Sequence, residues 1–195
     1  MGLSLTYFSS RELAAIAMCA GLWGVLNSIF SPTFFRLTGM PFLCDLIGFS
    51  VLTLAAWWIG KLGAITAIGL NATAINFIMV PGGFQFLGFT GASIFFDLVV
   101  TILRNRIPFR KAGYNFAIMV PISIGSAAVA GYLIGVFFMA GPVLINWGGP
   151  LGWAGLHSIG GVIGGSIGAF LIAALNSRNI LNHDLTKKQR QQDSR

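Results

Sequence analysis

Six long apolar segments run along the chain, and short breaks that contain proline, glycine or charge separate them. The segments cover approximately residues 12–30, 42–59, 62–80, 85–103, 113–140 and 151–175. A helix needs about 20 mostly apolar residues to cross a bilayer, so the pattern predicts six membrane-spanning helices. The fifth segment contains Pro121 but is too short for two spans, and we expect one tilted or kinked helix there.

The composition agrees with this pattern. The chain has 195 residues, of which 55% are hydrophobic and only 9% are charged, with a mean hydropathy of +0.81. A soluble domain is usually about 25% charged. The 26 glycines suit membrane helices, which tolerate and use them. We therefore expect an all-α integral membrane domain over residues 1–178 and a polar, basic cytoplasmic tail over residues 179–195.

The distribution of basic residues predicts the orientation. Six spans put both termini on one side of the membrane, and cytoplasmic loops are enriched in Lys and Arg. If the termini are cytoplasmic, all 12 Lys and Arg residues except Arg36 fall on the inner side. This asymmetry accounts for the net charge of +7 without a nucleic-acid partner. The expected location is the cell membrane, with the lipid bilayer as the surroundings.

Motifs of common enzymes are missing from the sequence. It contains neither G-x-x-x-x-G-K-[ST] nor H-E-x-x-H, and His157 is the only histidine within an apolar segment. Asp45 is expected near the outer end of its helix, whereas Asp97 lies ~18 Å along its helix from that end. The two carboxylates are then too far apart to share a proton as a catalytic pair. We expect no enzyme activity, no cofactor and no metal site.

Ionisable residues within apolar segments are functional candidates. For Asp45, near the outer end of the second span, a role in a binding pocket and a stabilising charge at a helix N-terminus both remain open. For Asp97 we expect a structural ion pair near Arg104 or Lys61. For His157 a hydrogen-bonded core position is favoured, and ligand contact remains open.

Arg36 is the one cation expected on the outer face. It lies in a predicted loop between Pro32 and Pro41, next to Phe34 and Phe35. Two interpretations remain open. As part of a lid, Arg36 pairs with a carboxylate or phosphate of a substrate. Alternatively, its side chain reaches the phosphates of the lipid headgroups.

Small residues recur every three or four positions in two segments, which lets helix backbones approach closely. In the last span we expect this pattern to serve internal packing. In the first span, internal packing and contact with a second protein both remain open. The small residues are Ala14, Ala17, Gly21, Gly24 and Ser28 in the first span, and Gly160, Gly161, Gly164, Gly165, Gly168 and Ala169 in the last.

Three stretches carry a resemblance to a known family: "SSRELAAIAMCAGLWGVLN", "LGFTGASIFFDLV" and "HSIGGVIGGSIGAFLIAAL". With the length and the six spans, the chain from about Ser10 to Arg178 resembles the S component of energy-coupling factor (ECF) transporters. Such proteins capture a vitamin or a similar micronutrient from outside. They associate with a membrane coupling subunit and a pair of ATPase subunits, which fits a chain that has no nucleotide motif of its own.

The resemblance also implies which residues bind. S components present an A-x-x-x-A-like pattern on their first helix to the coupling subunit; Ala17 and Gly21 match it, and Ala20 and Gly24 repeat the spacing. Substrate binds near the outer surface under the outer loops. Together with Asp45, the residues expected to bind substrate are Arg36, Gln85, Asn146, Trp147, Trp153 and His157.

Two other functions remain possible at this point. A stand-alone secondary transporter needs internal repeats and helices broken at the membrane midplane, and no convincing repeat relates the two halves. A membrane scaffold protein would work through its small-residue faces without a substrate. Ligand-induced thermal stabilisation separates the scaffold from the others, and purification with ATPase partners separates the importer subunit from the secondary transporter.

The orientation can be tested by cysteine labelling. In a variant without the two native cysteines, a cysteine that replaces Arg106 should resist an impermeant thiol reagent in intact cells, because this basic loop is expected inside. It should react after the membrane is permeabilised. Labelling of Arg106→Cys from outside would contradict the predicted topology.

Overall fold

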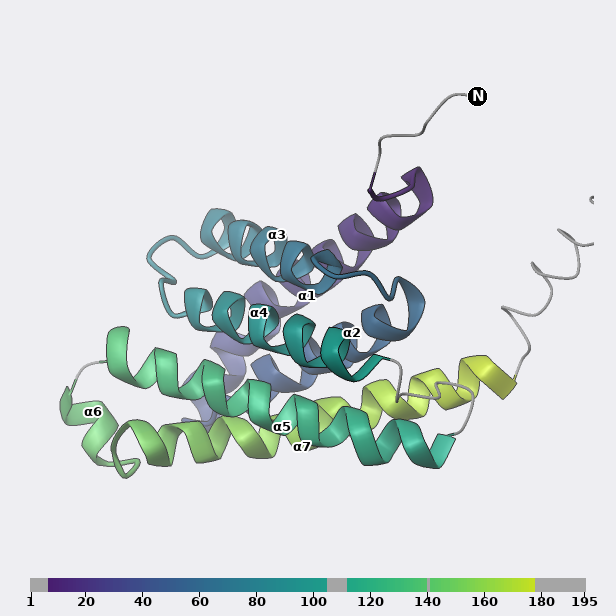
Figure 1. Cartoon of the computed structure of the whole chain (residues 1–195). Coiled ribbons are helices and arrows are strands. Elements are labelled where there is room, and N and C mark those ends of the chain that lie inside the picture. Colours follow the sequence, from purple (N-terminus) through teal and green to yellow (C-terminus); the bar gives the residue numbers. More distant parts are fainter. Residues whose placement is uncertain (1–6, 105–111, 140, 178–195) are drawn as a thin grey trace, which may run out of the picture.

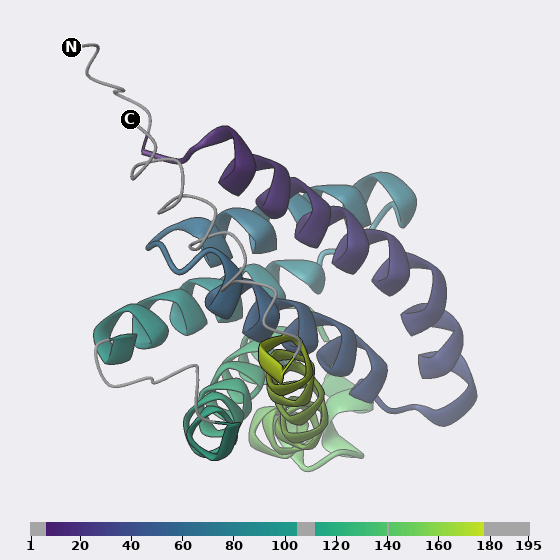
Figure 2. The same ribbon diagram turned by 90° about the vertical axis from the view of Figure 1, so that its right-hand side faces the viewer.

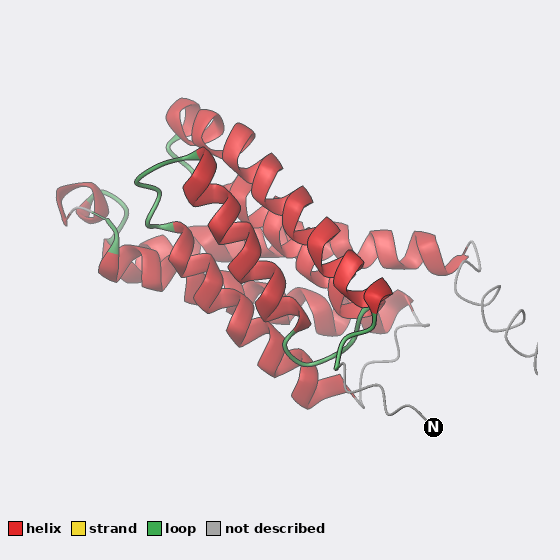
Figure 3. Cartoon of the chain, turned by 90° about the horizontal axis from the view of Figure 1, so that it is seen from above, coloured by secondary structure: helices red, strands yellow, loops and turns green. Residues whose placement is uncertain are grey.

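The computed structural model describes residues 7–104, 112–139 and 141–177, and these residues form helices joined by short connections (Figures 1 and 3). The all-α prediction is confirmed for this part of the chain. The predicted tail at 179–195 and most of the loop chosen for labelling lie outside it. The helices are α1 (Ser10–Thr38), α2 (Phe42–Trp58), α3 (Ala64–Met79), α4 (Phe86–Leu103), α5 (Ala112–Phe137), α6 (Gly141–Ile145) and α7 (Gly149–Ser177).

Four of these helices are long and apolar enough to cross a membrane, namely α1, α4, α5 and α7. The helices α2 and α3 are also apolar but have only 17 and 16 residues. Large apolar side chains point outward, among them Ile78, Ile102 and Phe170, which are 80%, 77% and 65% exposed. Such a surface suits lipid rather than water. These features indicate a helical membrane protein, and a crossing of the membrane by α2 and α3 as well as by the four longer helices stays a prediction.

The helices alternate in direction, so the connections gather at two ends (Figure 1). One end holds the start of α1, the α2–α3 connection, the end of α4 and the end of α7. We call it the basic end, because Arg11, Lys61 and Arg104 lie there. The opposite end, which we call the cavity end, holds the α1–α2 and α3–α4 connections and α6. The start of α1 and the end of α7 therefore share one end, as the six-span prediction requires.

Contacts at the basic end tie the start of α1 to the α2–α3 connection. Ser9 and Glu12 form a capping box: the Ser9 hydroxyl accepts from the Glu12 backbone N–H, and Glu12 Oε2 accepts from the Ser9 N–H at 2.8 Å. The same carboxylate binds Lys61 Nζ at 2.7 Å. Lys61 also donates to the Tyr7 carbonyl at 2.9 Å.

The prediction of a proline-flanked loop around Arg36 is wrong. Helix α1 continues through Pro32 and ends at Gly39, which has φ 70° and donates its N–H to the Phe35 carbonyl at 2.7 Å. Proline removes one backbone donor, but membrane helices tolerate this where hydroxyls and neighbours satisfy the freed groups. Arg36 therefore occupies the last turn of a helix and not a lid. The single helix expected through Pro121 is observed as α5.

Helix α7 packs closely on α5 and α2, and Figure 2 shows the three side by side. Its glycines form the contact surfaces. A Cβ at Gly164 would lie 2.7 Å from the carbonyl oxygen of Asp45 in α2, and one at Gly161 would lie 2.7 Å from the carbonyl oxygen of Ser123 in α5. The expectation that these stripes serve internal packing is confirmed, and each stripe meets a different helix.

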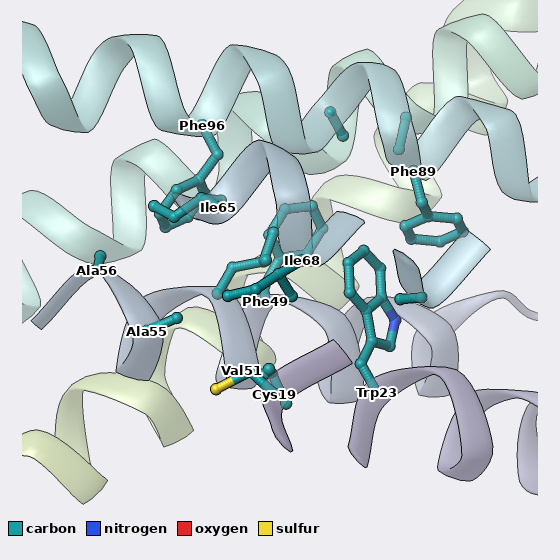
Figure 4. Packing of buried hydrophobic residues seen from close by; sticks show 14 of the residues in the cluster. Cys19, Trp23, Phe49, Val51, Ala55, Ala56, Ile65, Ile68, Phe89 and Phe96 are labelled. Carbon is teal, nitrogen blue, oxygen red and sulfur yellow. The ribbon is translucent and has the colours of Figure 1, made fainter. Parts of the chain in front are cut away.

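Aromatic and aliphatic side chains fill the centre between α1, α2, α3 and α4 (Figure 4). The rings of Phe49 and Phe96 stack with centroids 6.3 Å apart, and Trp23 meets Phe89 edge-on at 6.0 Å. A Cβ at Gly48 would lie 3.0 Å from the Trp23 ring, so this glycine makes room for the indole. The core fixes the relative positions of the helices that surround the cavity.

The glycine packing predicts opposite effects for two alanine substitutions in α7. Gly164→Ala should destabilise the protein by about 1–3 kcal/mol, because a methyl group there meets backbone atoms that cannot move aside. Gly155→Ala should be neutral or slightly stabilising, because no atom lies within 4 Å of the added carbon. Thermal unfolding in detergent measures both. Equal effects would contradict close packing at Gly164.

Candidate binding cavity

A cavity of about 300 Å³ opens at the cavity end of the helix bundle. Residues from α1, α2, α4, α5 and α7 line it, together with Val80 at the end of α3. Ligand sites of membrane bundles commonly lie between helices in this way. Most of the wall is apolar, and its aromatic members are Phe35, Phe86, Phe89, Phe138 and Trp153.

Four of the residues expected to bind substrate line this cavity together, from α1, from α7 and from the position just before α4. Arg36 lies in the last turn of α1 and Gln85 immediately precedes α4, and both are exposed. Trp153 and His157 lie one turn apart in α7 and are buried, 3% and 2% exposed. These residues meet because the expected outer ends of their helices converge at the cavity end.

The other three expected residues do not line the cavity. Asn146 is exposed after the one-turn helix α6. Trp147 stands behind Trp153, with ring centroids 6.1 Å apart, and packs near Gly39 at the end of α1. Asp45 is completely buried and reaches the cavity only through His157. Trp147 and Asp45 therefore support the wall from behind.

Asp45 and His157 form a buried pair that joins α2 to α7. Asp45 Oδ1 lies 3.0 Å from His157 Nδ1, and their side chains are 0% and 2% exposed. The second atom of each group, Asp45 Oδ2 and His157 Nε2, meets no hydrogen-bond partner among the described residues. Because Gly160 has no side chain, the Asp45 carboxyl group fits against the α7 backbone; a Cβ there would lie 2.6 Å from Oδ2.

The pairing of Asp45 with His157 was not predicted from the sequence. The two residues are 112 positions apart, so no local spacing connects them. Both residues were expected just inside the outer ends of their helices, and this shared depth in the membrane was the available signal for their pairing. The favoured role of His157 as a hydrogen-bonded core residue is confirmed, and the same ring also faces the cavity wall.

A second buried polar group joins α1 to α3 and was also missed. Asn27 Nδ2 donates to Asn76 Oδ1 at 3.1 Å, and Ser28 Oγ donates to the same oxygen at 2.8 Å. Ser31 Oγ donates to Asn27 Oδ1 at 2.6 Å, and Ser31 lines the cavity. Buried polar groups need such partners. The four-residue spacing from Asn27 to Ser31 was the available signal.

Asp97 does not form the expected ion pair with Lys61 or Arg104. Its Oδ2 accepts hydrogen bonds from the backbone N–H groups of Gly63 and Thr66, at 2.8 and 3.0 Å, and from the Thr66 hydroxyl at 2.9 Å. The carboxylate thus caps the start of α3, where free N–H groups attract negative charge. This places Asp97 at the basic end, away from the cavity.

The small residues of α1 separate into buried and open positions. Ala20 is 1% exposed, and Gly24 packs on α3, where an added Cβ would lie 2.8 Å from Ile75 Cβ. Both serve internal packing, and the expectation that they contact a partner is corrected. Ala17 is exposed, and no atom lies within 4 Å of a Cβ added at Gly21. Of the four residues expected to contact a partner, these two remain open to a second protein.

Comparisons of the chain with protein-family models, with curated proteins and with solved structures give no match.

The buried pair predicts strong coupling between two substitutions. Removing one partner leaves the other polar group buried and unpaired, so Asp45→Asn and His157→Gln should each lower the melting temperature. The double variant should lose less stability than the sum, with a coupling of about 0.5–3 kcal/mol. A double-mutant cycle by thermal unfolding in detergent measures this. Strict additivity would show that the two side chains do not interact.

Proposed function

We propose that the chain is the substrate-binding S component of an ECF-type importer, located in the cell membrane. It captures a vitamin or a related micronutrient from the outer face, and partner subunits supply the ATP-driven uptake. The observation that carries the proposal is the cavity at one end of an apolar helix bundle, where Arg36, Gln85, Trp153 and His157 converge. A capture subunit needs such a site and no catalytic group.

The charge distribution gives the cavity its proposed orientation. Arg11, Lys61 and Arg104 lie at the basic end, and Arg36 lies at the cavity end. Under the positive-inside rule the basic end faces the cytoplasm, so the cavity opens to the outside. This agrees with six spans and two cytoplasmic termini, which remain part of the proposal.

The proposed partners are a membrane coupling subunit and a pair of ATPase subunits. The small residues of α1 are covered by α3 at Gly24 but are open at Ala17 and Gly21. Apolar side chains border the open part, including Leu13 and Met18, which are 53% and 64% exposed. Small residues in such a setting let another helix approach closely. We therefore place the docking face at Ala17 and Gly21.

Two features favour this function over its rivals. A secondary transporter needs helices broken near the midplane, whereas α1 and α5 continue without a break through Pro32 and Pro121. A scaffold protein needs no ligand site, whereas the cavity has polar side chains set in an aromatic wall. The capture subunit accounts for both observations.

The docking face can be tested by introducing a bulky ring. Ala17→Trp and Gly21→Trp should prevent co-purification with a coexpressed coupling subunit and its ATPases, because they block close backbone approach. Leu22→Trp is the control, since Leu22 is 51% exposed on another side of the same helix.

The control variant should retain the complex, and all three variants should keep the thermal stability of the unmodified protein. Complexes that survive both Ala17→Trp and Gly21→Trp would place the docking face elsewhere. If the unmodified chain never associates with a coupling subunit and ATPases, the proposed function is wrong.

A further inference from the structure

Two buried ring nitrogens, on residues that line the cavity, have no hydrogen-bond partner within the described part of the chain. They are the indole nitrogen of Trp153 and the Nε2 atom of His157. Both side chains are more than nine-tenths buried, and their ring centroids lie 5.4 Å apart. Buried polar groups without a partner are costly and rare in native proteins, so these two atoms point to a bound group that satisfies them.

A neutral Asp45–His157 pair carries a hydrogen on Nε2 in both of its forms. A net charge buried in apolar surroundings is strongly unfavourable, so the neutral pair, which holds one acidic proton, is the favoured form. If the proton is on Nδ1, the imidazolium ring carries hydrogen on both nitrogens. If it is on Asp45, the carboxyl O–H donates to Nδ1, and the neutral ring keeps its hydrogen on Nε2. In both forms of the neutral pair, Nε2 is a donor.

The remaining polar lining completes a donor-rich surface. Arg36 contributes a guanidinium group at the rim, and it is exposed, so solvent screens its charge from the buried pair. Gln85 can donate as well as accept, whereas the Ser31 hydroxyl already donates to Asn27 Oδ1 and can only accept. Among the described lining residues there is no carboxylate. A ligand of this cavity must therefore supply hydrogen-bond acceptors, and a negative charge is favoured over a positive one.

We propose that the cavity binds an aromatic or heteroaromatic carboxylate. Its ring lies among Phe35, Phe86 and Phe89, and its carboxylate oxygens accept from Trp153 Nε1, from His157 Nε2 and from Arg36. The volume of about 300 Å³ suits a body of one or two rings. Aromatic walls favour a planar body through edge and offset contacts. This inference deepens the proposed function and rests on it, because it takes the cavity to be the capture site.

A set of three matched probes tests the ligand class. They are 2-naphthoate, its uncharged amide 2-naphthamide, and the cation 2-naphthylmethylammonium, which share one ring system and differ in the polar group. Equilibrium dialysis and thermal shift with the full-length protein in detergent measure binding. We expect 2-naphthoate to bind at least roughly tenfold more tightly than the amide, because hydrogen bonds to a charged acceptor are stronger. The cation should not bind.

Matched variants locate the binding groups. Trp153→Phe removes the N–H and keeps an aromatic ring, and it should weaken 2-naphthoate binding roughly tenfold. Trp23→Phe is the control, because Trp23 is equally buried with an unpartnered Nε1 but does not line the cavity. It should leave binding unchanged. Arg36→Gln, at an exposed position that folding does not require, should also weaken binding roughly tenfold or more.

Several results would overturn the inference. These are amide or cation binding as tight as that of 2-naphthoate, no binding of any probe, or unchanged 2-naphthoate affinity in both Trp153→Phe and Arg36→Gln. If Trp153→Phe does not fold, unchanged 2-naphthoate affinity in Arg36→Gln alone overturns the inference. Association with the ATPase partners is measured separately. A complex that forms while the cation binds best refutes only the ligand class, and 2-naphthoate binding without any complex refutes only the importer function.

Discussion

The close approach of α7 to α2 and α5 is the constraint on which the rest of the structure depends. Glycines at the contact let backbone meet backbone, as at Gly164 against the Asp45 carbonyl and Gly161 against the Ser123 carbonyl. In a bilayer, helices gain little from hydrophobic burial against one another, so this packing is a main source of their association. The same approach places Asp45 against Gly160 and within hydrogen-bond distance of His157. The cavity wall is therefore built on the glycine contacts.

Most polar groups of the described bundle satisfy one another, and two of the exceptions belong to residues that line the cavity. At the basic end, Asp97 caps α3 and Lys61 binds Glu12. Such pairing is expected where no water can replace a missing partner. At the cavity end, Trp153 and His157 instead keep ring nitrogens without partners, although both residues are buried. The ligand proposed for the cavity would supply partners for these two nitrogens.

The continuous first helix changes how ligand binding is expected to work. A flexible lid that carries Arg36 would have to become ordered when the ligand binds, at an entropic cost. In the structure, Arg36 is held at the rim by the last turn of α1, which ends at Gly39. Phe35 in the same turn contacts Trp153 edge-on at 6.1 Å. The rim and the wall are thus preorganised over these residues for the proposed ligand.

The sequence by itself determined that the protein is an all-α membrane protein with a small-residue contact surface in its last helix, because hydropathy and glycine spacing follow from local composition. It also indicated that Arg36, Gln85, Trp153 and His157 lie at one end, since each is near the same expected end of a helix. Only the tertiary structure decided that Asp45 pairs with His157, and that Gly24 is covered while Gly21 is open. It also decided that α1 continues through Pro32. These outcomes depend on which helix faces meet, and side chains far apart in the chain decide that.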